Sequence, residues 1–288
     1  MEGKLYLCGT PIGNLEDITY RAVSTLKACD VVFAEDTRHS VRLLNHLEIR
    51  KPLYSYHEHN METAGPEIVR RVREGETVAL VTDAGMPGIS DPGEQLVALF
   101  IEEGLPFEVI PGVTAFTTAL VGSGLKTGQF VFEGFLSRDK RQKKKHVERL
   151  KNEWRTLIFY EAPHRLKETL NILNTVLGGD RQAVVARELT KRYEEYRRDS
   201  LSELYAYYSE QPPKGEIVLL VEGISQEQLS AEQEAAPDIP ENLYDHYELL
   251  CRQGLDGKAA MKQVASARGI KKSEVYAAVL AHKTSDTL

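Results

Sequence analysis

The sequence has little cysteine and no long apolar run, and both shortages exclude classes of protein. Its three cysteines, Cys8, Cys29 and Cys251, form no Cys-x-x-Cys pair, so they make neither a disulfide framework nor a zinc site. The longest purely apolar run, residues 96–101, is far too short to cross a bilayer, and the first residues lack the apolar segment of a secretory signal. We therefore expect a soluble, cytoplasmic protein with no membrane partner.

Two common phosphate-binding fingerprints are also missing. The loop at residues 9–14 reads Gly-Thr-Pro-Ile-Gly-Asn, which is not Gly-x-Gly-x-x-Gly and does not end in the Gly-Lys-Ser/Thr of a Walker loop. Both absences argue against an NAD enzyme and against an ATPase.

Charge is distributed unevenly along the chain. The net charge of the 288 residues is -7, yet residues 138–151 hold eight Lys/Arg against two acids, and residues 252–272 hold six against one. The stretch 226–241 carries five acids and no base. Because local charge decides binding to a polyanion, the two basic segments predict a nucleic-acid partner despite the acidic total.

The first part of the chain alternates strands and helices. We expect strands at 4–8, 30–34, 77–82 and 107–110, with helices at 19–28, up to Leu47, after a cap at Asp91, and from Thr114. This order predicts a mostly parallel α/β sheet, whose ligands bind at the carboxyl ends of the strands. The loops 9–14, 83–93 and 111–115 all leave strand ends, so they are expected to meet in one cleft.

The second part predicts another α/β domain and a small helical one. Strands are expected at 129–133, 155–160, 183–187 and 216–222, helices at 163–177 and 201–208, and three short helices at 243–253, 257–268 and 272–281. The last two have the spacing of a helix-turn-helix. They predict nucleic-acid binding, although packing or dimerisation remain alternatives. The expected domains are 1–122 and 123–225 (both α/β), an acidic linker at 226–240, and a C-terminal helical domain at 241–288.

Polar residues gather at several predicted strand ends. Loop 83–93 contains three glycines and two prolines, and Asp83 at its start can bind a ribose hydroxyl or an ammonium group. His57 and His59 share one face of an extended segment, but no third ligand is evident, so we expect no metal. Two further clusters, at 160–165 and 187–191, belong to the second domain and suit a cleft between the domains.

These motifs, in this order, resemble the tetrapyrrole methylase superfamily, the class III S-adenosylmethionine methyltransferases. Within it, they are similar to the members that methylate ribosomal RNA of the small subunit. The resemblance covers residues 4–224, and the tail resembles that group's C-terminal helix-turn-helix. It is carried by the segments 9–17, 34–38, 83–93, 111–112, 160–165 and 187–191.

The resemblance implies a fold, a cofactor and an acceptor. Two α/β domains of the tetrapyrrole methylase type would hold S-adenosyl-L-methionine in the cleft between them. The acceptor would be the ribose 2′-hydroxyl of a cytidine in the decoding region of 16S rRNA, within the small ribosomal subunit, and the protein would form a homodimer. The implied cofactor-binding residues are Pro11, Asp83, Gly85, Ser90, Asp91, Thr114, Ala115, Leu189 and Gly215.

Catalysis and RNA binding yield two further sets of candidates. A ribose hydroxyl needs a proton acceptor as it attacks, and a carboxylate, a neutral lysine or a histidine can serve. The unranked catalytic candidates are Asp36, His57, Glu161, Glu188 and Lys191. The candidates for contact with RNA phosphates are Arg38, Arg138, Lys140, Arg141, Lys143, Lys144, Lys145, Arg165 and Arg187.

Two alternatives remain open. A tetrapyrrole or diphthine methylase would share the fold and the cofactor, although a small ring needs neither the basic stretch nor the helical tail. A non-catalytic nucleic-acid-binding protein would use the C-terminal helices without a cofactor.

Overall fold

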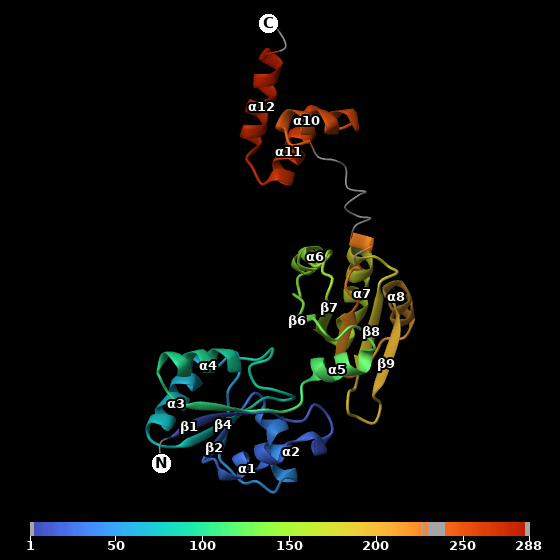
Figure 1. Ribbon diagram of the computed structural model, residues 1–288. Coiled ribbons are helices and arrows are strands. Elements are labelled where there is room, and N and C mark those ends of the chain that lie inside the picture. The colour runs from blue at the N-terminus through green and yellow to red at the C-terminus, as the bar shows by residue number, and fades with distance from the viewer. Residues whose placement is uncertain (1–2, 226, 230–239, 286–288) are drawn as a thin grey trace. The chain divides into compact units, whose positions relative to one another are not determined.

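The computed structural model describes residues 3–225, 227–229 and 240–285, and within them the chain divides into two compact units. The first unit, 1–226, holds two five-stranded sheets (Figure 1). The second unit, 227–288, holds helices. Most of the expected acidic linker at 226–240 lies outside the described residues. Among the described residues, no helix is long and apolar enough to cross a membrane.

The first sheet is entirely parallel, as expected, with the order β3-β2-β4-β1-β5. Its strands are β1 (Lys4–Cys8), β2 (Val31–Ala34), β3 (Leu53–Ser55), β4 (Thr77–Val81) and β5 (Phe107–Ile110). Its helices are η1 (Leu15–Asp17), α1 (Tyr20–Ala28), α2 (Thr37–His46), α3 (Met61–Arg73) and α4 (Gly93–Glu102). Helices α1 and α2 cover one face and α3 and α4 the other (Figure 1), which buries both faces as a parallel sheet requires.

The second sheet is mixed, with the order β6-β7-β10-β8-β9, and only β6 and β7 pair in parallel. Its strands are β6 (Phe130–Phe135), β7 (Thr156–Glu161), β8 (Gln182–Arg187), β9 (Glu195–Ser200) and β10 (Ile217–Val221). Its helices are α5 (Ala115–Ser123), α6 (Lys140–Arg149), α7 (Pro163–Leu177) and α8 (Leu201–Glu210). Helices α6, α7 and α8 pack on one face, and α5 packs on the other.

Helix α5 joins the two halves of the first unit. The expected boundary at 122/123 assigns it to the first domain, but Ala119 and Leu120 pack against Ile158, Val184 and Val218 of the second sheet. Ile12, from the loop after β1, enters the same apolar cluster. The first-sheet loops are therefore anchored in the core of the second sheet.

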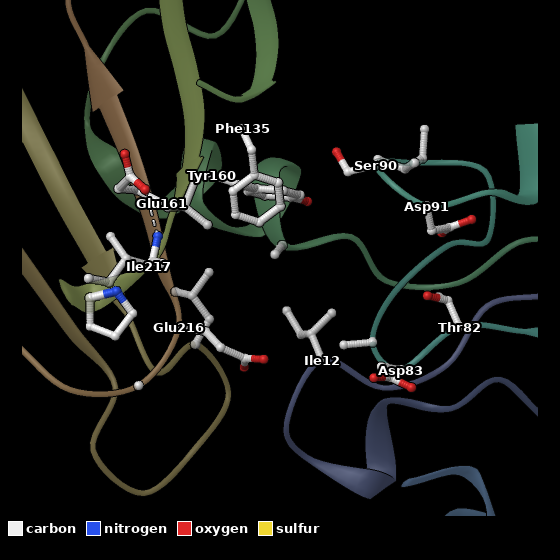
Figure 2. Close-up of a pocket in the computed structure, with 18 of the residues that line it drawn as sticks. Ile12, Thr82, Asp83, Ser90, Asp91, Phe135, Tyr160, Glu161, Glu216 and Ile217 are labelled. Atoms are coloured by element: carbon white, nitrogen blue, oxygen red, sulfur yellow. Dashed lines mark hydrogen bonds between the residues drawn. The ribbon is translucent and has the colours of Figure 1, made fainter. Parts of the chain in front are cut away.

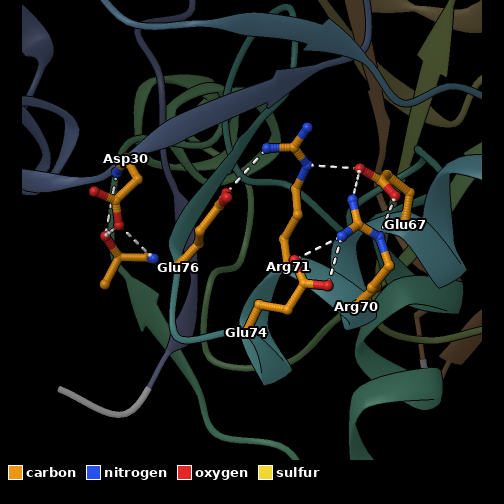
Figure 3. Close-up of polar contacts among 7 residues, drawn as sticks. Asp30, Glu67, Arg70, Arg71, Glu74 and Glu76 are labelled. Carbon is orange, nitrogen blue, oxygen red and sulfur yellow. Dashed lines mark hydrogen bonds and ion pairs between the residues drawn. The ribbon is translucent and has the colours of Figure 1, made fainter.

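The opposite edge of the first sheet, at the amino ends of its strands, is closed by polar contacts (Figure 3). Asp30 Oδ2 accepts hydrogen bonds from the amide (2.7 Å) and hydroxyl (2.6 Å) of Thr77, which lower the pKa of Asp30. Arg71 bridges Glu67 and Glu76 at 2.8 and 2.9 Å. Ion pairs near the surface contribute about 0–1 kcal/mol each to stability. These contacts therefore stabilise the amino edge of the sheet only slightly.

The second unit is a bundle of α10 (Leu243–Arg252), α11 (Gly257–Arg268) and α12 (Lys272–Ser285). Asp256 caps α11 by accepting from two backbone amides at 2.8 Å, and Gly269, with φ +64°, ends it. Leu250, Val264 and Val275 are among the residues of its core. The expected helix-turn-helix spacing of α11 and α12 is confirmed.

Candidate functional site

A cavity of about 430 Å³ lies where the carboxyl edge of the first sheet meets the second sheet (Figure 2). It is large enough for a cofactor-sized ligand. The first sheet and its loops contribute Ile12, Glu35, Thr82, Asp83, Ala84, Ile89, Ser90 and Asp91. The second sheet, with α5 and α7, contributes Ala115, Phe135, Tyr160, Glu161, Ala162, Pro163, Leu189, Gly215, Glu216, Ile217 and Val218.

The wall of the cavity is acidic. Within the part of the chain that the structure describes, five carboxylates line it and no lysine, arginine or histidine does. Such a wall favours a ligand that carries positive charge and opposes entry of a bare phosphate backbone. The five are Glu35, Asp83, Asp91, Glu161 and Glu216.

One oxygen of the Asp91 carboxylate stabilises the glycine-rich loop 83–93 by accepting two backbone hydrogen bonds. Its Oδ1 accepts hydrogen bonds from the amides of Gly88 (2.8 Å) and Gly93 (2.7 Å). Helix α4 begins at Gly93 with Pro92 as its cap residue, so the expected cap by Asp91 is displaced by one position. Asp91 Oδ2 is buried and makes no hydrogen bond of standard geometry among the described residues. The hydroxyl of Thr82, which donates to Glu35 at 2.8 Å, lies near enough to act against the rise in the pKa of Asp91. A buried, unpartnered carboxylate oxygen in a cavity wall marks a place for a ligand's donor or positive charge.

Burial raises the pKa of Asp91, although the two amide hydrogen bonds oppose the shift. Burial and the neighbouring charge of Glu35 likewise raise the pKa of Asp83. Both shifts mean that the negatively charged form of the carboxylate is less stable here than in water. A cationic ligand relieves that penalty.

The loops of the two sheets touch at the rim of the cavity. The amide of Asn14 donates to Thr190 Oγ1 at 2.9 Å, and the backbone of Gly13 packs so closely that a Cβ there would lie 2.8 Å from the carbonyl oxygen of Leu189. Thr190 and Glu188 adopt positive φ angles of 63° and 51°. Such strained backbone persists where surrounding contacts enforce it, so this contact between the sheets is specific.

The structure brings six of the nine expected cofactor-binding residues onto the cavity wall. They are Asp83, Ser90, Asp91, Ala115, Leu189 and Gly215. The other three, Pro11, Gly85 and Thr114, lie directly beside wall residues in the chain. Thr10 and Gly85 exchange two backbone hydrogen bonds of 2.8 and 3.1 Å, which join the loops after β1 and β4.

Of the five catalytic candidates, only Glu161 lines the cavity. Its carboxylate is buried, and it accepts hydrogen bonds from the Ala162 amide (2.8 Å) and the Thr169 hydroxyl. His57, which follows the edge strand β3, is not among the lining residues. Asp36 caps α2 and is chelated by the guanidinium of Arg38, which holds the pKa of Asp36 well below its usual range. Arg38 is thereby engaged, although it stays exposed.

Glu188 and Lys191 form a cluster of their own at the rim. The ammonium of Lys191 lies 3.0 Å from Glu188 and 2.6 Å from Glu216. Burial lowers the pKa of Lys191, but the two carboxylates outweigh it and raise the pKa overall. Both carboxylates favour the charged form of Lys191 and so oppose the neutral form that a proton acceptor needs. Burial acts to raise the pKa of Glu188, but the hydrogen bonds from Lys191 and the Glu216 amide, together with the charges of Lys191 and Arg187, outweigh it, and the net shift is downward.

Helix α6 presents most of the expected RNA-binding side chains to solvent. Arg138, Lys140, Arg141, Lys144 and Lys145 are all exposed. They form a basic surface, hereafter the α6 surface.

Lys143 departs from the expected set, because it points inward. It is 1% exposed, and its ammonium lies 3.2 Å from Glu168 and 3.1 Å from the hydroxyl of Thr169. The expectation that Lys143 contacts RNA phosphates is wrong for this reason. Since Thr169 in turn donates to Glu161, Lys143 supports the cavity wall from behind.

Lys143→Met is expected to reduce the free energy of unfolding by about 1–3 kcal/mol, because Thr169 and Glu168 lose a charge-assisted partner. Urea unfolding measures the change. Lys144→Met, one position along and exposed, serves as the control and is expected to stay within about 0.5 kcal/mol of the wild type. Equal stability of both variants would show that the buried contact contributes nothing.

The remaining arginines of the expected RNA-binding set are held by neighbours. Arg165 donates to the carbonyl oxygens of Leu136 (2.6 Å) and Ser137 (3.0 Å). Arg187 pairs with Glu195 at 2.5 Å. Both are mostly buried, so their first role is structural.

One cluster of possible metal ligands occurs among the described residues. Oxygen and nitrogen atoms of Asp36, His39 and Asp83 lie within 4.8 Å of one another. The carboxylate of Asp36 already accepts hydrogen bonds from Arg38, and His39 Nδ1 lies 3.4 Å from Asp83 Oδ2. The cluster is satisfied by these contacts.

The chain matches the model of a known protein family over most of its length. Residues 4–205 match the family model of the tetrapyrrole (corrin/porphyrin) methylases. The chain belongs to the tetrapyrrole methylase family. This confirms the expected fold class and the expected enzyme class, a methyltransferase that uses S-adenosylmethionine.

Relatives of high sequence identity lie within that family. The ribosomal RNA small subunit methyltransferase I of Halalkalibacterium halodurans is 48% identical over 275 residues, which cover 96% of this chain and 94% of the relative. The protein of the same name from Bacillus subtilis is 46% identical over 274 residues, covering 95% and 93%.

Solved structures agree on the fold. Uroporphyrin-III-C-methyltransferase from Thermus thermophilus superposes with a TM-score of 0.54 at 22% identity, covering 83% of this chain and 98% of that one. The same enzyme in complex with S-adenosyl homocysteine gives 0.56 at 19% identity, covering 76% and 97%.

The cavity fits the cofactor of this family. S-adenosylmethionine carries an ammonium and a sulfonium, and the wall offers five carboxylates together with the unpartnered Oδ2 of Asp91. Its apolar parts can rest on Ile12, Leu189 and Val218.

Several wall residues had no warning in the sequence. Phe135 and Ile217 lie in strands and were not singled out, whereas Tyr160 belongs to the expected cluster 160–165. Glu35 and Glu216 do stand at strand ends, a signal that was available but not distinctive. The wall is completed by residues from both sheets, which only the packing of the two sheets reveals.

Proposed function

We propose that this chain transfers a methyl group from S-adenosylmethionine to the ribose 2′-hydroxyl of a cytidine in the decoding region of small-subunit ribosomal RNA. The observation that carries the proposal is the pairing of an acidic cavity with the exposed basic α6 surface on the same unit. The names of the relatives support the same substrate class. We take the assembled small ribosomal subunit as the substrate, because proteins recognise structured RNA largely by its shape.

The carboxylates of the cavity wall and the apolar residues Ala115 and Leu189 would hold the cofactor. When bound, S-adenosylmethionine supplies an activated methyl group on a positively charged sulfur. Asp91 Oδ2 and Asp83 offer negative charge to its cationic and hydroxyl groups. Leu189 and Ala115 would cover its apolar parts. Gly215 lets the carboxylate of Glu188 approach the backbone at the rim, since a Cβ there would lie 2.0 Å from Glu188.

The chain must also position the acceptor and take its proton. Holding a hydroxyl in line for attack contributes on the order of 7–11 kcal/mol in well-oriented systems. We assign the proton acceptor to a carboxylate, because the described residues of the wall include five carboxylates and neither lysine nor histidine. Of the five catalytic candidates, Glu161 lines the wall, and its carboxylate accepts from Thr169 and Ala162 and lies 3.5 Å from Arg165.

The α6 surface supplies the attraction for RNA that the cavity does not. Basic side chains that replace counterions along phosphates give affinity without sequence preference. The C-terminal unit adds a second basic surface, because Lys258, Lys262, Lys271 and Lys272 are exposed on α11, on α12 and in the turn between them. We assign both surfaces to RNA contact. The chain acts in the cytoplasm as a homodimer in this proposal.

Closure of the cavity rim can be tested at Gly13. Gly13→Ala places a Cβ against Leu189, Thr190 and Lys191 and is expected to weaken S-adenosylmethionine binding measurably by calorimetry, with a loss of about 1–3 kcal/mol in unfolding free energy. Gly128→Ala meets no atom within 4 Å and serves as the control. Unchanged binding in Gly13→Ala would show that the rim contact is not needed.

The function is tested in a strain from which the gene has been deleted. Mass spectrometry of nucleosides from purified small-subunit RNA is expected to lose 2′-O-methylcytidine at one position, and the wild-type gene is expected to restore it. An unchanged content of 2′-O-methylcytidine in small-subunit RNA would contradict the proposal.

A further inference from the structure

An exposed phenylalanine stands at the mouth of the cavity. Phe135, the last residue of β6, lines the cavity and is 55% exposed (Figure 2). Ile89, from the glycine-rich loop of the first sheet, lines the same cavity and is 40% exposed. Large apolar side chains left open to water on both sides of one cavity point to a flat, apolar ligand group between them.

A β-bulge aims Phe135 at the cavity. In the pairing of β6 with β7, Phe132 lies opposite Ile158 and Phe135 lies opposite Tyr160, so three residues of β6 span two of β7. Gly134, with φ +61°, absorbs the extra residue. Without the bulge, Phe132 and Phe135 would face opposite sides of the sheet. With it, they face the same side.

The aromatic neighbours hold Phe135 in place. Its ring lies 5.5 Å from that of Tyr160, which lies 4.9 Å from Phe132, which in turn stacks on Phe116 at 4.6 Å. Phe135 is therefore the open end of a packed aromatic row. A ring fixed in this way loses little conformational entropy when a ligand stacks on it.

The chain leads from Phe135 directly to the α6 surface. Exposed Arg138 follows three residues later, and α6 begins at Lys140. A nucleotide whose base rests on Phe135 would thus have its neighbouring phosphates beside basic side chains, while its ribose faces the acidic cavity. RNA-binding proteins commonly stack splayed bases on aromatic rings.

We propose that Phe135 is the stacking platform for the nucleobase of the acceptor nucleotide, turned out of its RNA stack, and that Ile89 covers the other side of that base. This subsite rests on the proposed function and names how its acceptor is held. Stacking tolerates any base, so the platform positions the nucleotide and leaves base selection to other contacts.

The test compares Phe135→Ala, Phe135→Trp and the matched control Phe130→Ala, on the same strand but outside the cavity. Methyl transfer to undermethylated small ribosomal subunits gives kcat/KM, and calorimetry gives the Kd for S-adenosylmethionine. We expect Phe135→Ala to lower kcat/KM by roughly 5- to 150-fold. Phe135→Trp and Phe130→Ala should remain near the wild type, and all three should bind the cofactor normally.

Three results would overturn the platform. Unchanged kcat/KM in Phe135→Ala would show that no base stacks there. A parallel loss of cofactor binding would assign the ring to the adenine of the cofactor. An equal loss in Phe130→Ala would indicate general damage to the aromatic row. Absence of transfer by the wild-type chain would instead overturn the proposed function, and the subsite with it.

Discussion

Asp91→Asn is expected to raise the Kd for S-adenosylmethionine by roughly 10- to 150-fold, which corresponds to about 1.5–3 kcal/mol for a hydrogen bond to a charged group. The amide keeps an oxygen for the backbone of Gly88 and Gly93, so the loop should hold its shape. What is lost is the negative charge of the carboxylate and the acceptor at Oδ2, the buried atom without a partner. Isothermal calorimetry measures the change.

Asp256→Asn is the matched control for this substitution. Asp256 also accepts two backbone amide hydrogen bonds, but at the start of α11 in the other unit. The Asp256→Asn variant should bind S-adenosylmethionine with the affinity of the wild type. If Asp91→Asn also binds the cofactor normally, then Oδ2 does not face the ligand and the position of the cofactor in the cavity must be revised.

Cofactor affinity should also depend on pH. Burial raises the pKa of both Asp83 and Asp91 above the usual 3.8. As the pH falls from neutral, these two carboxyls therefore protonate before ordinary aspartates do, and the cavity loses the charge that attracts a cation. Affinity is expected to decline over that range, and the decline should shrink in Asp91→Asn. A pH-independent Kd would contradict this electrostatic role.

Neutralising the α6 surface is expected to have the second large effect. The triple variant Lys140→Gln, Arg141→Gln and Lys145→Gln should weaken RNA binding by about 50- to 150-fold near 150 mM salt. The slope of log affinity against log salt should become shallower by about 2–3, because each lost phosphate contact removes about 0.7–0.9. Filter binding to small subunits at several salt concentrations measures both, and cofactor binding should not change.

A control with equal loss of charge separates this surface from total charge. Lys27, Arg42 and Arg50 are exposed on or beside the helices of the first sheet. Their replacement by glutamine should leave the salt slope close to that of the wild type. If both triple variants weaken binding equally, RNA responds to net charge alone, and the α6 surface is not the docking face.

The regular elements of the fold followed from the sequence where local signals were strong. The parallel first sheet and the loops 9–14 and 83–93 were expected, because apolar runs end at glycine-rich exits. Helix α3 was missed because Gly65 and Pro66 interrupt it, although the helix continues through them. Strand β9 was missed because its sequence, Glu-Tyr-Arg-Arg-Asp-Ser, is polar, as an edge strand allows.

The site was harder to predict than the fold. Lys143 was grouped with its basic neighbours, yet Val147 and Leu150 follow it at helical spacing and mark the buried face that it shares. Phe135 could not be found at all, because a bulge at Gly134 breaks the alternation of β6 on which such a prediction depends. Contacts between distant segments, such as Asn14 with Thr190, leave no trace in local sequence.

In the proposed function, the acidic cavity holds S-adenosylmethionine while its methyl group is transferred to small-subunit RNA. The most direct measurement follows radiolabelled methyl from the cofactor into small ribosomal subunits isolated from the deletion strain, with the wild-type chain and with Asp91→Asn. Label in 2′-O-methylcytidine with the wild type, and much less with the variant at limiting cofactor, is the expected result. Cofactor binding without any label in the RNA would contradict the substrate, and equal labelling by both proteins would contradict the role of the cavity.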